Sequence, residues 1–223
     1  MKIVVVDGYA MNPGDLRWDG LGEFGKYEIH PRSTSEEVLD RCRDTQIVIT
    51  NKVVFNKQVI EILPELKYIG VTATGYNNVD IEAASKNGIT VTNVPAYSTE
   101  SVAQMTFALL LELTQRVGHH SETVHNGIWT GSEDFCYWDY PLYELAGMTM
   151  GIIGYGQIGK AVSRIASAFG MDVLVRTRSQ ISSDNIQVEA VSLEDLFRRS
   201  DIVSLHCPLT PETSGIINKD TLD

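Results

Sequence analysis

Closely spaced glycines that follow an apolar run are the clearest sign of a ligand site in this sequence. The run at 149–153 has the pattern of a buried strand, and the run at 157–169 has the pattern of an amphipathic helix. In such a strand–turn–helix, glycines allow a tight turn, close approach of the backbone to a pyrophosphate, and close helix–strand packing. The helix also offers N–H groups to phosphate, although a glycine-rich turn can be purely structural. We favour a dinucleotide site contacted by Gly154, Gly156, Gln157, Ile158 and Gly159.

The end of the next apolar run, at 172–176, bears on which dinucleotide binds. An acidic residue there accepts hydrogen bonds from the adenosine ribose of NAD and repels a 2′-phosphate. This chain instead reads Arg176, Thr177, Arg178 and Ser179. Because arginine binds phosphate through charge-assisted, often bidentate hydrogen bonds, the sequence favours NADP. The alternative is that the arginines point into solvent and NAD binds without an acidic anchor.

Strand-like and helix-like runs alternate through the first part of the chain. The predicted strands are 3–6, 27–30, 46–50, 68–71 and 90–93, and the predicted helices are 35–43, 56–63 and 81–87. Ser35 is a capping residue at a helix start, and two acidic residues follow it. Strands that alternate with helices predict a parallel sheet covered on both faces.

A long apolar helix and an aromatic segment follow. The run at 98–126 reads as one helix that is apolar on most sides, which predicts burial between layers. The segment at 128–143 is rich in aromatic residues and has no clear period. It is either a loop packed on its own domain or an arm that buries its aromatics against another subunit. With the long helix, it leads us to predict a two-fold homodimer.

A second alternating block completes the chain. It has predicted strands at 149–153, 172–176 and 201–206, and predicted helices at 157–169 and 192–199. A further helix has just begun where the chain stops. Two such blocks joined by a long helix predict two doubly wound α/β domains with a cleft between them.

Composition excludes some classes of partner. The net charge of −11 argues against nucleic acid, because phosphate binding needs a basic face. No apolar run approaches the ~20 residues of a membrane span. The apolar run at 3–6 is too short for a signal peptide, which predicts a cytoplasmic protein.

Metal and disulfide chemistry are not predicted. The cysteines Cys42, Cys136 and Cys207 lie far apart, so we expect each to be a small buried hydrophobe. His119 and His120 are adjacent on the predicted helix, where neighbouring side chains point about 100° apart. That spacing does not suit a shared metal ion.

Several stretches fit one family in combination. They are 72–80, 92–95, 101–104, the glycine turn and 206–213. Across the whole chain they resemble the D-isomer-specific 2-hydroxyacid dehydrogenase family. The residues 7–9, 12–16 and Trp18, together with the aromatic segment, are most similar to its glycerate dehydrogenase (hydroxypyruvate reductase) branch.

The resemblance implies a flavodoxin-like substrate domain at 1–97 and a Rossmann NAD(P)-binding domain at 98–223. The substrate carboxylate would bind Thr74, Gly75 and Tyr76, where exposed amides form an anion nest, and Lys52 is a further candidate. Gly75 as a turn residue and Lys52 as a solvated lysine remain the alternatives. Gln104 stands where the family usually has glutamate. The cofactor would further contact Val102, His206, Cys207, Pro208 and Thr213.

The resemblance also implies the reaction and its catalytic groups. The family reduces a 2-oxo acid with an arginine, a glutamate and a histidine, all of which we expect beyond Asp223. We therefore predict no catalytic residue in this chain, both domains incomplete at the C-terminal end, and no activity for the chain as given. His206 is rejected as proton donor because its motif places it beside the cofactor.

The expected reaction converts hydroxypyruvate or glyoxylate to D-glycerate or glycolate. The alternatives are a phosphoglycerate dehydrogenase-like or other member of the family, and a non-catalytic protein that senses NAD(P) through partner binding.

Overall fold

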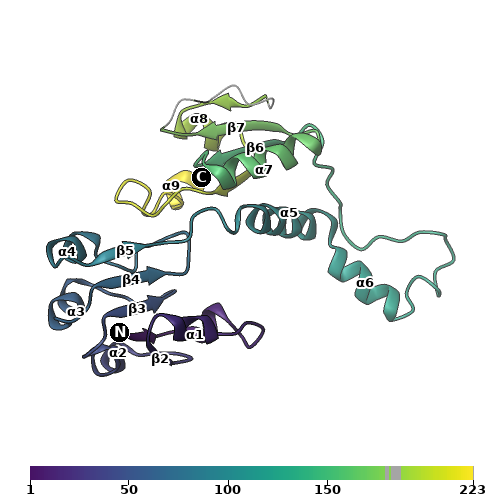
Figure 1. The fold of residues 1–223 in the computed structure, drawn as a ribbon. Helices are drawn as coiled ribbons and strands as arrows, with labels where there is room; N and C mark the ends of the chain where they lie inside the picture. Colours follow the sequence, from purple (N-terminus) through teal and green to yellow (C-terminus); the bar gives the residue numbers. More distant parts are fainter. Residues whose placement is uncertain (179–180, 182–186, 223) are drawn as a thin grey trace. The chain divides into compact units, whose positions relative to one another are not determined.

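The computed structural model describes residues 1–178, 181 and 187–222. The chain divides into two compact units, Met1–Tyr97 and Ser98–Asp223 (Figure 1). Among the described residues, the structure contains no helix with the length and apolar character needed to cross a membrane.

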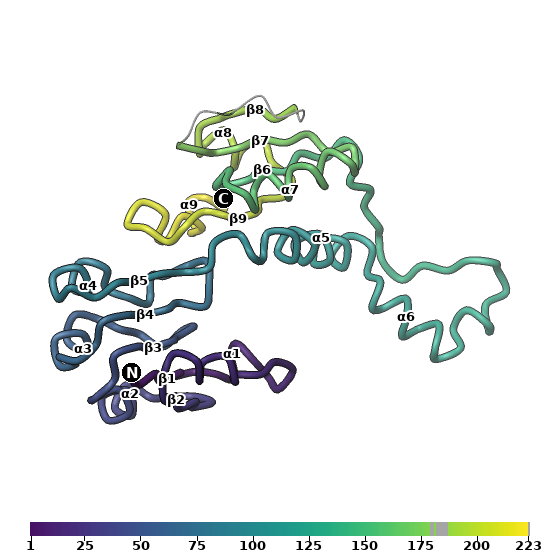
Figure 2. Tube along the Cα trace, in the orientation of Figure 1, coloured from purple at the N-terminus to yellow at the C-terminus, as the bar shows by residue number. Residues whose placement is uncertain are grey.

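The first unit is built on a parallel sheet with the strand order β2-β1-β3-β4-β5 (Figure 2). This is the flavodoxin-like order, so the predicted fold of this region is confirmed. Val4, Val48 and Ile69 are fully buried in its core. The strands are β1 (Lys2–Val5), β2 (Lys26–Ile29), β3 (Ile47–Thr50), β4 (Tyr68–Val71) and β5 (Thr90–Thr92).

The helices of the first unit begin at polar capping residues. Thr34, and not the predicted Ser35, caps α2: its hydroxyl accepts from the Glu37 N–H, and the Glu37 carboxylate accepts from the Thr34 N–H at 2.8 Å. This reciprocal pair satisfies two backbone donors at once. The elements are α1 (Gly8–Met11), the 3₁₀ helix η1 (Asp19–Glu23), α2 (Ser35–Cys42), α3 (Lys57–Ile62) and α4 (Ile81–Lys86).

The second unit contains a parallel sheet with the order β8-β7-β6-β9. Numbered from β6, this is 3-2-1-4, one half of a dinucleotide-binding fold. The strands are β6 (Thr149–Ile153), β7 (Asp172–Arg176), β8 (Glu189–Ala190) and β9 (Ile202–Leu205). The helices are α5 (Thr99–Gln115), α6 (Val117–His125), α7 (Gln157–Ala168), α8 (Leu193–Arg199) and α9 (Lys219–Leu222).

The predicted single helix at 98–126 is wrong. The chain turns at Arg116, whose φ of 49° is left-handed, so α5 ends there and α6 begins on a new axis. The guanidinium of Arg116 lies 4.3 Å from the centre of the Tyr140 ring. The aromatic segment that follows α6 therefore contacts the chain at the residue where α5 and α6 meet.

The predicted burial of this helix is also only half correct. One face of α5 packs on α7, and Phe107 stacks on Phe169 with ring centres 5.4 Å apart. The opposite face is exposed within the chain and carries Met105, Leu109 and Leu113.

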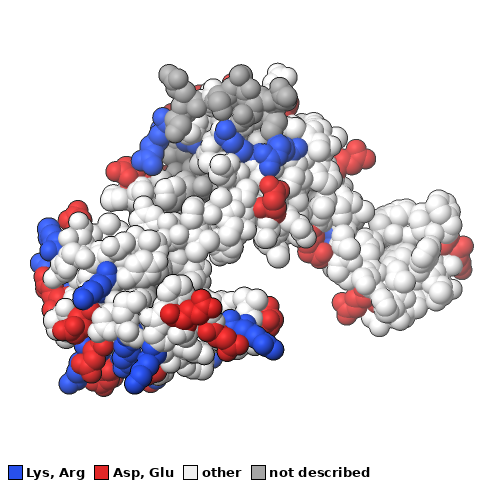
Figure 3. Space-filling view, in the orientation of Figure 1, with Lys and Arg blue, Asp and Glu red and all other residues white. Residues whose placement is uncertain are grey.

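The aromatic segment at 128–143 folds back on α6 through polar contacts. The Nε2 of His119 lies 2.7 Å from Oδ2 of Asp139, and the hydroxyls of Thr123 and Tyr137 are 2.6 Å apart. Its largest side chains still face solvent, with Phe135 89% exposed and Trp138 73% exposed. In Figure 3 the lobe formed by α6 and this segment is mostly uncharged on the face shown.

Candidate functional site

A cavity of about 340 Å³ lies at the carboxyl ends of β6, β7 and β9. Ile153 and Arg176 end β6 and β7, and His206 directly follows β9. Two backbone hydrogen bonds join these ends: Gly154 N donates to Arg176 O at 2.9 Å, and His206 N donates to Ile153 O at 2.7 Å. Residues predicted to contact the cofactor line the cavity, namely Gly154, Gly156, Arg176, Thr177, Arg178, His206, Cys207, Pro208 and Thr213.

Two glycines of the turn are required by packing. Gly154 has a φ of 98°, and a Cβ added to it would lie 2.6 Å from the His206 carbonyl oxygen and the Cys207 nitrogen. A Cβ on Gly159 would lie 2.2 Å from the Gly154 carbonyl oxygen. Both positions therefore exclude larger residues for reasons internal to the protein.

Gly156 differs from both, because a Cβ added to it meets nothing within 4 Å. Its φ of −84° is also open to any L-residue. Neither packing nor backbone conformation requires glycine here. The open space above Gly156 is where the backbone of such a turn approaches a pyrophosphate, so this position fits the predicted dinucleotide.

The N-terminus of α7 faces the same turn. Gly156 is the N-cap, so no side chain caps the helix, and the first turn leaves N–H groups for an anion. Gln157 is exposed and Ile158 is half-buried. Gln157, Ile158 and Gly159 lie on this turn and are not among the residues that line the cavity.

The wall formed by the end of β7 carries the two arginines. The Nη1 of Arg176 donates to Thr177 O at 3.0 Å, and Arg178 is exposed. Glu212 and Thr210 line the same cavity, and neither was predicted from the sequence to contact the cofactor. Ser179 lies outside the described residues.

His206 is held by a neighbour and is a poor proton donor. Its Nε2 lies 2.8 Å from the Ser204 hydroxyl, and burial lowers the pKa of its imidazole. A lowered pKa leaves the ring neutral at neutral pH.

Tyr155 is a further residue of the cavity wall that was not predicted from the sequence, and its hydroxyl has an unusual environment. It is buried and has no hydrogen-bond partner among the described residues. Buried polar groups normally have a partner, so this hydroxyl is one of the exceptions among the described residues.

Val102 lies on α5, and the structure does not place it in the cavity wall. It is half-buried, and its carbonyl accepts a hydrogen bond from the Thr106 hydroxyl at 2.8 Å.

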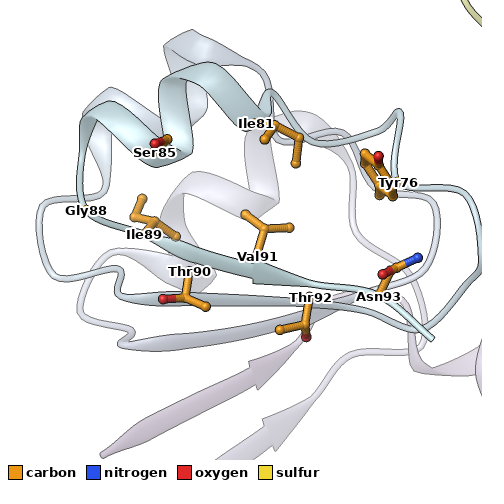
Figure 4. Close-up of a pocket in the computed structure, with 9 residues that line it drawn as sticks. All are labelled: Tyr76, Ile81, Ser85, Gly88, Ile89, Thr90, Val91, Thr92 and Asn93. Carbon is orange, nitrogen blue, oxygen red and sulfur yellow. The ribbon is translucent and has the colours of Figure 1, made fainter. Parts of the chain in front are cut away.

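The predicted substrate residues of the first unit fall at different places. Tyr76 lines a cavity of about 610 Å³ along α4 and the edge strand β5, where Figure 4 shows it at the same end as Asn93. Lys52 lines a separate cavity of about 780 Å³ with Asp7 and Arg32. Within this unit, the structure does not bring Lys52 and Tyr76 into one cavity.

The loop that holds Gly75 is anchored through its neighbours. Thr74 donates through its hydroxyl to the Val94 carbonyl at 3.3 Å, and the Thr74 carbonyl accepts from the Asn93 side chain at 2.9 Å. Thr74 and Gly75 are both exposed, so this loop lies at the surface of the unit.

Asp7 fixes the loop after β3, which sequence reasoning did not detect. Its buried carboxylate accepts from the N–H groups of Asn51, Lys52 and Val53 at 2.6 to 3.2 Å. These bonds set the backbone of Lys52 while its side chain remains exposed.

The cysteine prediction is correct in one case of three. Cys42 is buried, and burial raises the pKa of its thiol to about 12. Cys136 is exposed because it lies in the solvent-facing aromatic segment, and Cys207 is half-buried in the cavity wall. Among the described residues, no group of His, Cys, Asp or Glu is arranged to hold a metal ion.

Comparisons with known proteins agree with this geometry. The sequence model "D-isomer specific 2-hydroxyacid dehydrogenase, NAD binding domain" matches residues 107–223. The hydroxypyruvate reductase of Blautia hydrogenotrophica is 48% identical across the whole chain, which spans 70% of that protein. The glycerate dehydrogenase of Methylorubrum extorquens is 36% identical over 99% of the chain and 68% of its own length.

A solved structure shares the fold over the whole chain. It is an acyclic imino acid reductase in complex with NADPH and D-Arg, with a TM-score of 0.84 and 31% identity. The match covers 100% of this chain and 70% of that one. Because the cavity, the glycine turn and these similarities coincide in an NAD(P)-binding domain, the chain belongs to the D-isomer-specific 2-hydroxyacid dehydrogenases, oxidoreductases that transfer hydride between a nicotinamide cofactor and a 2-hydroxy acid.

Proposed function

We propose that this protein reduces hydroxypyruvate or glyoxylate to the corresponding D-2-hydroxy acid with NADPH as the preferred hydride donor. The observation that carries the proposal is the cavity at the ends of β6, β7 and β9, with open space at Gly156 and arginines on one wall. The names of the similar hydroxypyruvate reductase and glycerate dehydrogenase support this substrate class.

Different groups of this chain bind different parts of the cofactor. The turn at Gly156 and the first turn of α7 take the pyrophosphate through backbone N–H groups. Arg176 and Arg178 take a 2′-phosphate through charge-assisted hydrogen bonds. Thr177, His206, Cys207, Pro208 and Thr213 form the remaining wall. When bound, the nicotinamide supplies the hydride.

We assign residues 1–97 to substrate binding and residues 98–223 to cofactor binding. The exposed amides at Thr74, Gly75 and Tyr76 bind the substrate carboxylate, as in an anion nest, and Lys52 contributes positive charge. Val102 lies beside the nicotinamide. An arginine, a glutamate and a histidine outside these residues polarise the carbonyl and protonate its oxygen. We place the reaction in the cytoplasm.

Turnover tests the proposed reaction. The loss of reduced-nicotinamide absorbance is followed in the protein as the cell makes it, with hydroxypyruvate, glyoxylate, pyruvate and 3-phosphohydroxypyruvate in turn. We expect the highest kcat/KM with one of the first two. Absence of turnover with all four would contradict the function, and a preference for 3-phosphohydroxypyruvate would contradict the substrate.

The 223-residue chain alone is expected to bind cofactor without turnover. The one histidine of the cavity wall, among the described residues, is His206, which is neutral and held by Ser204. Measurable turnover by this chain would show that the proton donor lies within it.

We further propose that the protein is a homodimer that buries the exposed face of α5 and the aromatic segment. Leu113 and Trp138 are 74% and 73% exposed, which is unusual for large apolar side chains on one unit. We expect Leu113→Asp combined with Trp138→Asp to give monomers in sedimentation velocity, with Leu16→Asp as control because Leu16 is exposed on the first unit. A double variant that remains dimeric, or a wild type that is monomeric, would contradict this proposal.

A further inference from the structure

We propose that Glu212 is a cofactor-specificity residue that works against Arg178. Glu212 lines the same cavity as the arginine, and its carboxylate accepts hydrogen bonds from an unphosphorylated adenosine ribose and disfavours a 2′-phosphate. This inference rests on the proposed cofactor site and concerns its discrimination between NADPH and NADH.

The first support is position. Glu212 and Arg178 line one cavity, although they come from different parts of the chain. Arg178 follows β7, and Glu212 lies in the loop after β9, on the other side of β6 in the sheet. The end of β7 is where this fold places the adenosine ribose, so Glu212 borders the same cavity as that group would.

The second support is that the loop around Glu212 is internally braced. The Thr213 hydroxyl donates to the Pro208 carbonyl at 2.7 Å and accepts from the Thr210 N–H at 2.8 Å. These two bonds close the loop on either side of Glu212. Its carboxylate is therefore presented from a fixed backbone.

The third support is charge. A hydrogen bond from Thr210 lowers the pKa of the Glu212 carboxyl, its own backbone N–H adds to this, and the positive charge of Arg178 lowers it further. The carboxylate is thus ionised at neutral pH, and it lies within electrostatic reach of Arg178. A 2′-phosphate that approaches Arg178 meets this negative charge.

The consequence is that the acidic group missing from the end of β7 is supplied by another loop. A carboxylate at this place accepts hydrogen bonds from ribose hydroxyls and repels a 2′-phosphate. Arg178 has the opposite preference. With both groups present, the site discriminates between NADPH and NADH less strongly than the arginines alone would.

The test is fluorescence titration of NADPH and NADH with the 223-residue chain, for the wild type and for Glu212→Gln. Glutamine keeps the shape and removes the charge. We expect the Kd for NADPH to fall about tenfold and the Kd for NADH to rise severalfold, with a smaller change at high salt. Glu122→Gln is the matched control, because Glu122 is exposed on α6 and its loss changes the net charge equally.

The outcomes separate this inference from the function on which it rests. A wild type that binds neither cofactor would remove the proposed cofactor site and the inference together. Suppose instead that the wild type binds the cofactors. If Glu212→Gln then leaves the ratio of the Kd values for NADPH and NADH unchanged, or if Glu122→Gln changes that ratio equally, the role of Glu212 is overturned and the cofactor site is retained. Thermal unfolding of each variant checks that the fold is intact.

Discussion

Gly156→Ala should weaken NADPH binding by about a hundredfold while leaving the fold as stable as the wild type. The added methyl meets nothing in the protein within 4 Å, and alanine can adopt the backbone dihedral angles that Gly156 has. It does occupy the space through which a pyrophosphate approaches the turn. The measurements are the Kd for NADPH by fluorescence titration and the midpoint of urea unfolding.

Gly159→Ala is the matched control, because the same methyl group is added one helical turn away. There it would lie 2.2 Å from the Gly154 carbonyl oxygen, so the helix must shift. Overpacking of this kind typically costs about 1–3 kcal/mol of unfolding free energy. Equal stability losses in the two variants, or unchanged binding in Gly156→Ala, would show that Gly156 does not face the cofactor.

Replacement of both Arg176 and Arg178 by glutamine should raise the Kd for NADPH by roughly 10- to 100-fold, since a hydrogen bond to a charged group contributes about 1.5–3 kcal/mol. The Kd for NADH should change less than threefold, because NADH has no 2′-phosphate to lose. Both arginines line the cavity at the end of β7. Parallel titrations of the two cofactors make this comparison.

Arg198→Gln controls for the loss of positive charge. Arg198 is exposed on α8 and pairs with Asp195, and it is not among the residues that line the cavity. Because the double variant removes two charges and the control removes one, a loss of NADPH binding free energy no more than twice that of Arg198→Gln would be general electrostatics. If the double variant weakens both cofactors equally, the arginines do not recognise the 2′-phosphate.

The sequence alone was sufficient for features that depend on neighbouring residues. The alternating runs predicted every strand of the first unit, and β6, β7 and β9 of the second, to within a residue or two. The glycine turn was predicted between β6 and α7 because strand periodicity, turn glycines and helix periodicity are local signals. The two-residue strand β8 was missed because it is too short to show a period.

The tertiary structure alone separated roles that the sequence makes equivalent. Of the three glycines in the turn, packing requires Gly154 and Gly159 but not Gly156. At Gly154 the atoms that exclude a side chain belong to His206 and Cys207, which follow β9. Likewise, the predicted single helix is broken at a left-handed Arg116, whose guanidinium lies over the ring of Tyr140, 24 positions further along the chain. Contacts between residues distant in the sequence leave no local period.

The charged residues of the proposed cofactor cavity show the same difference between local sequence signals and tertiary contacts. The arginines after β7 could be read directly from the chain, because their position follows from the strand that precedes them. Glu212 could not, since only the β7-β6-β9 order brings its loop to the same cavity wall. The order of residues along the chain therefore placed two arginines after β7, and the folded arrangement of the strands added an acidic residue to their cavity, because electrostatic interactions depend on distance in space rather than on separation along the chain.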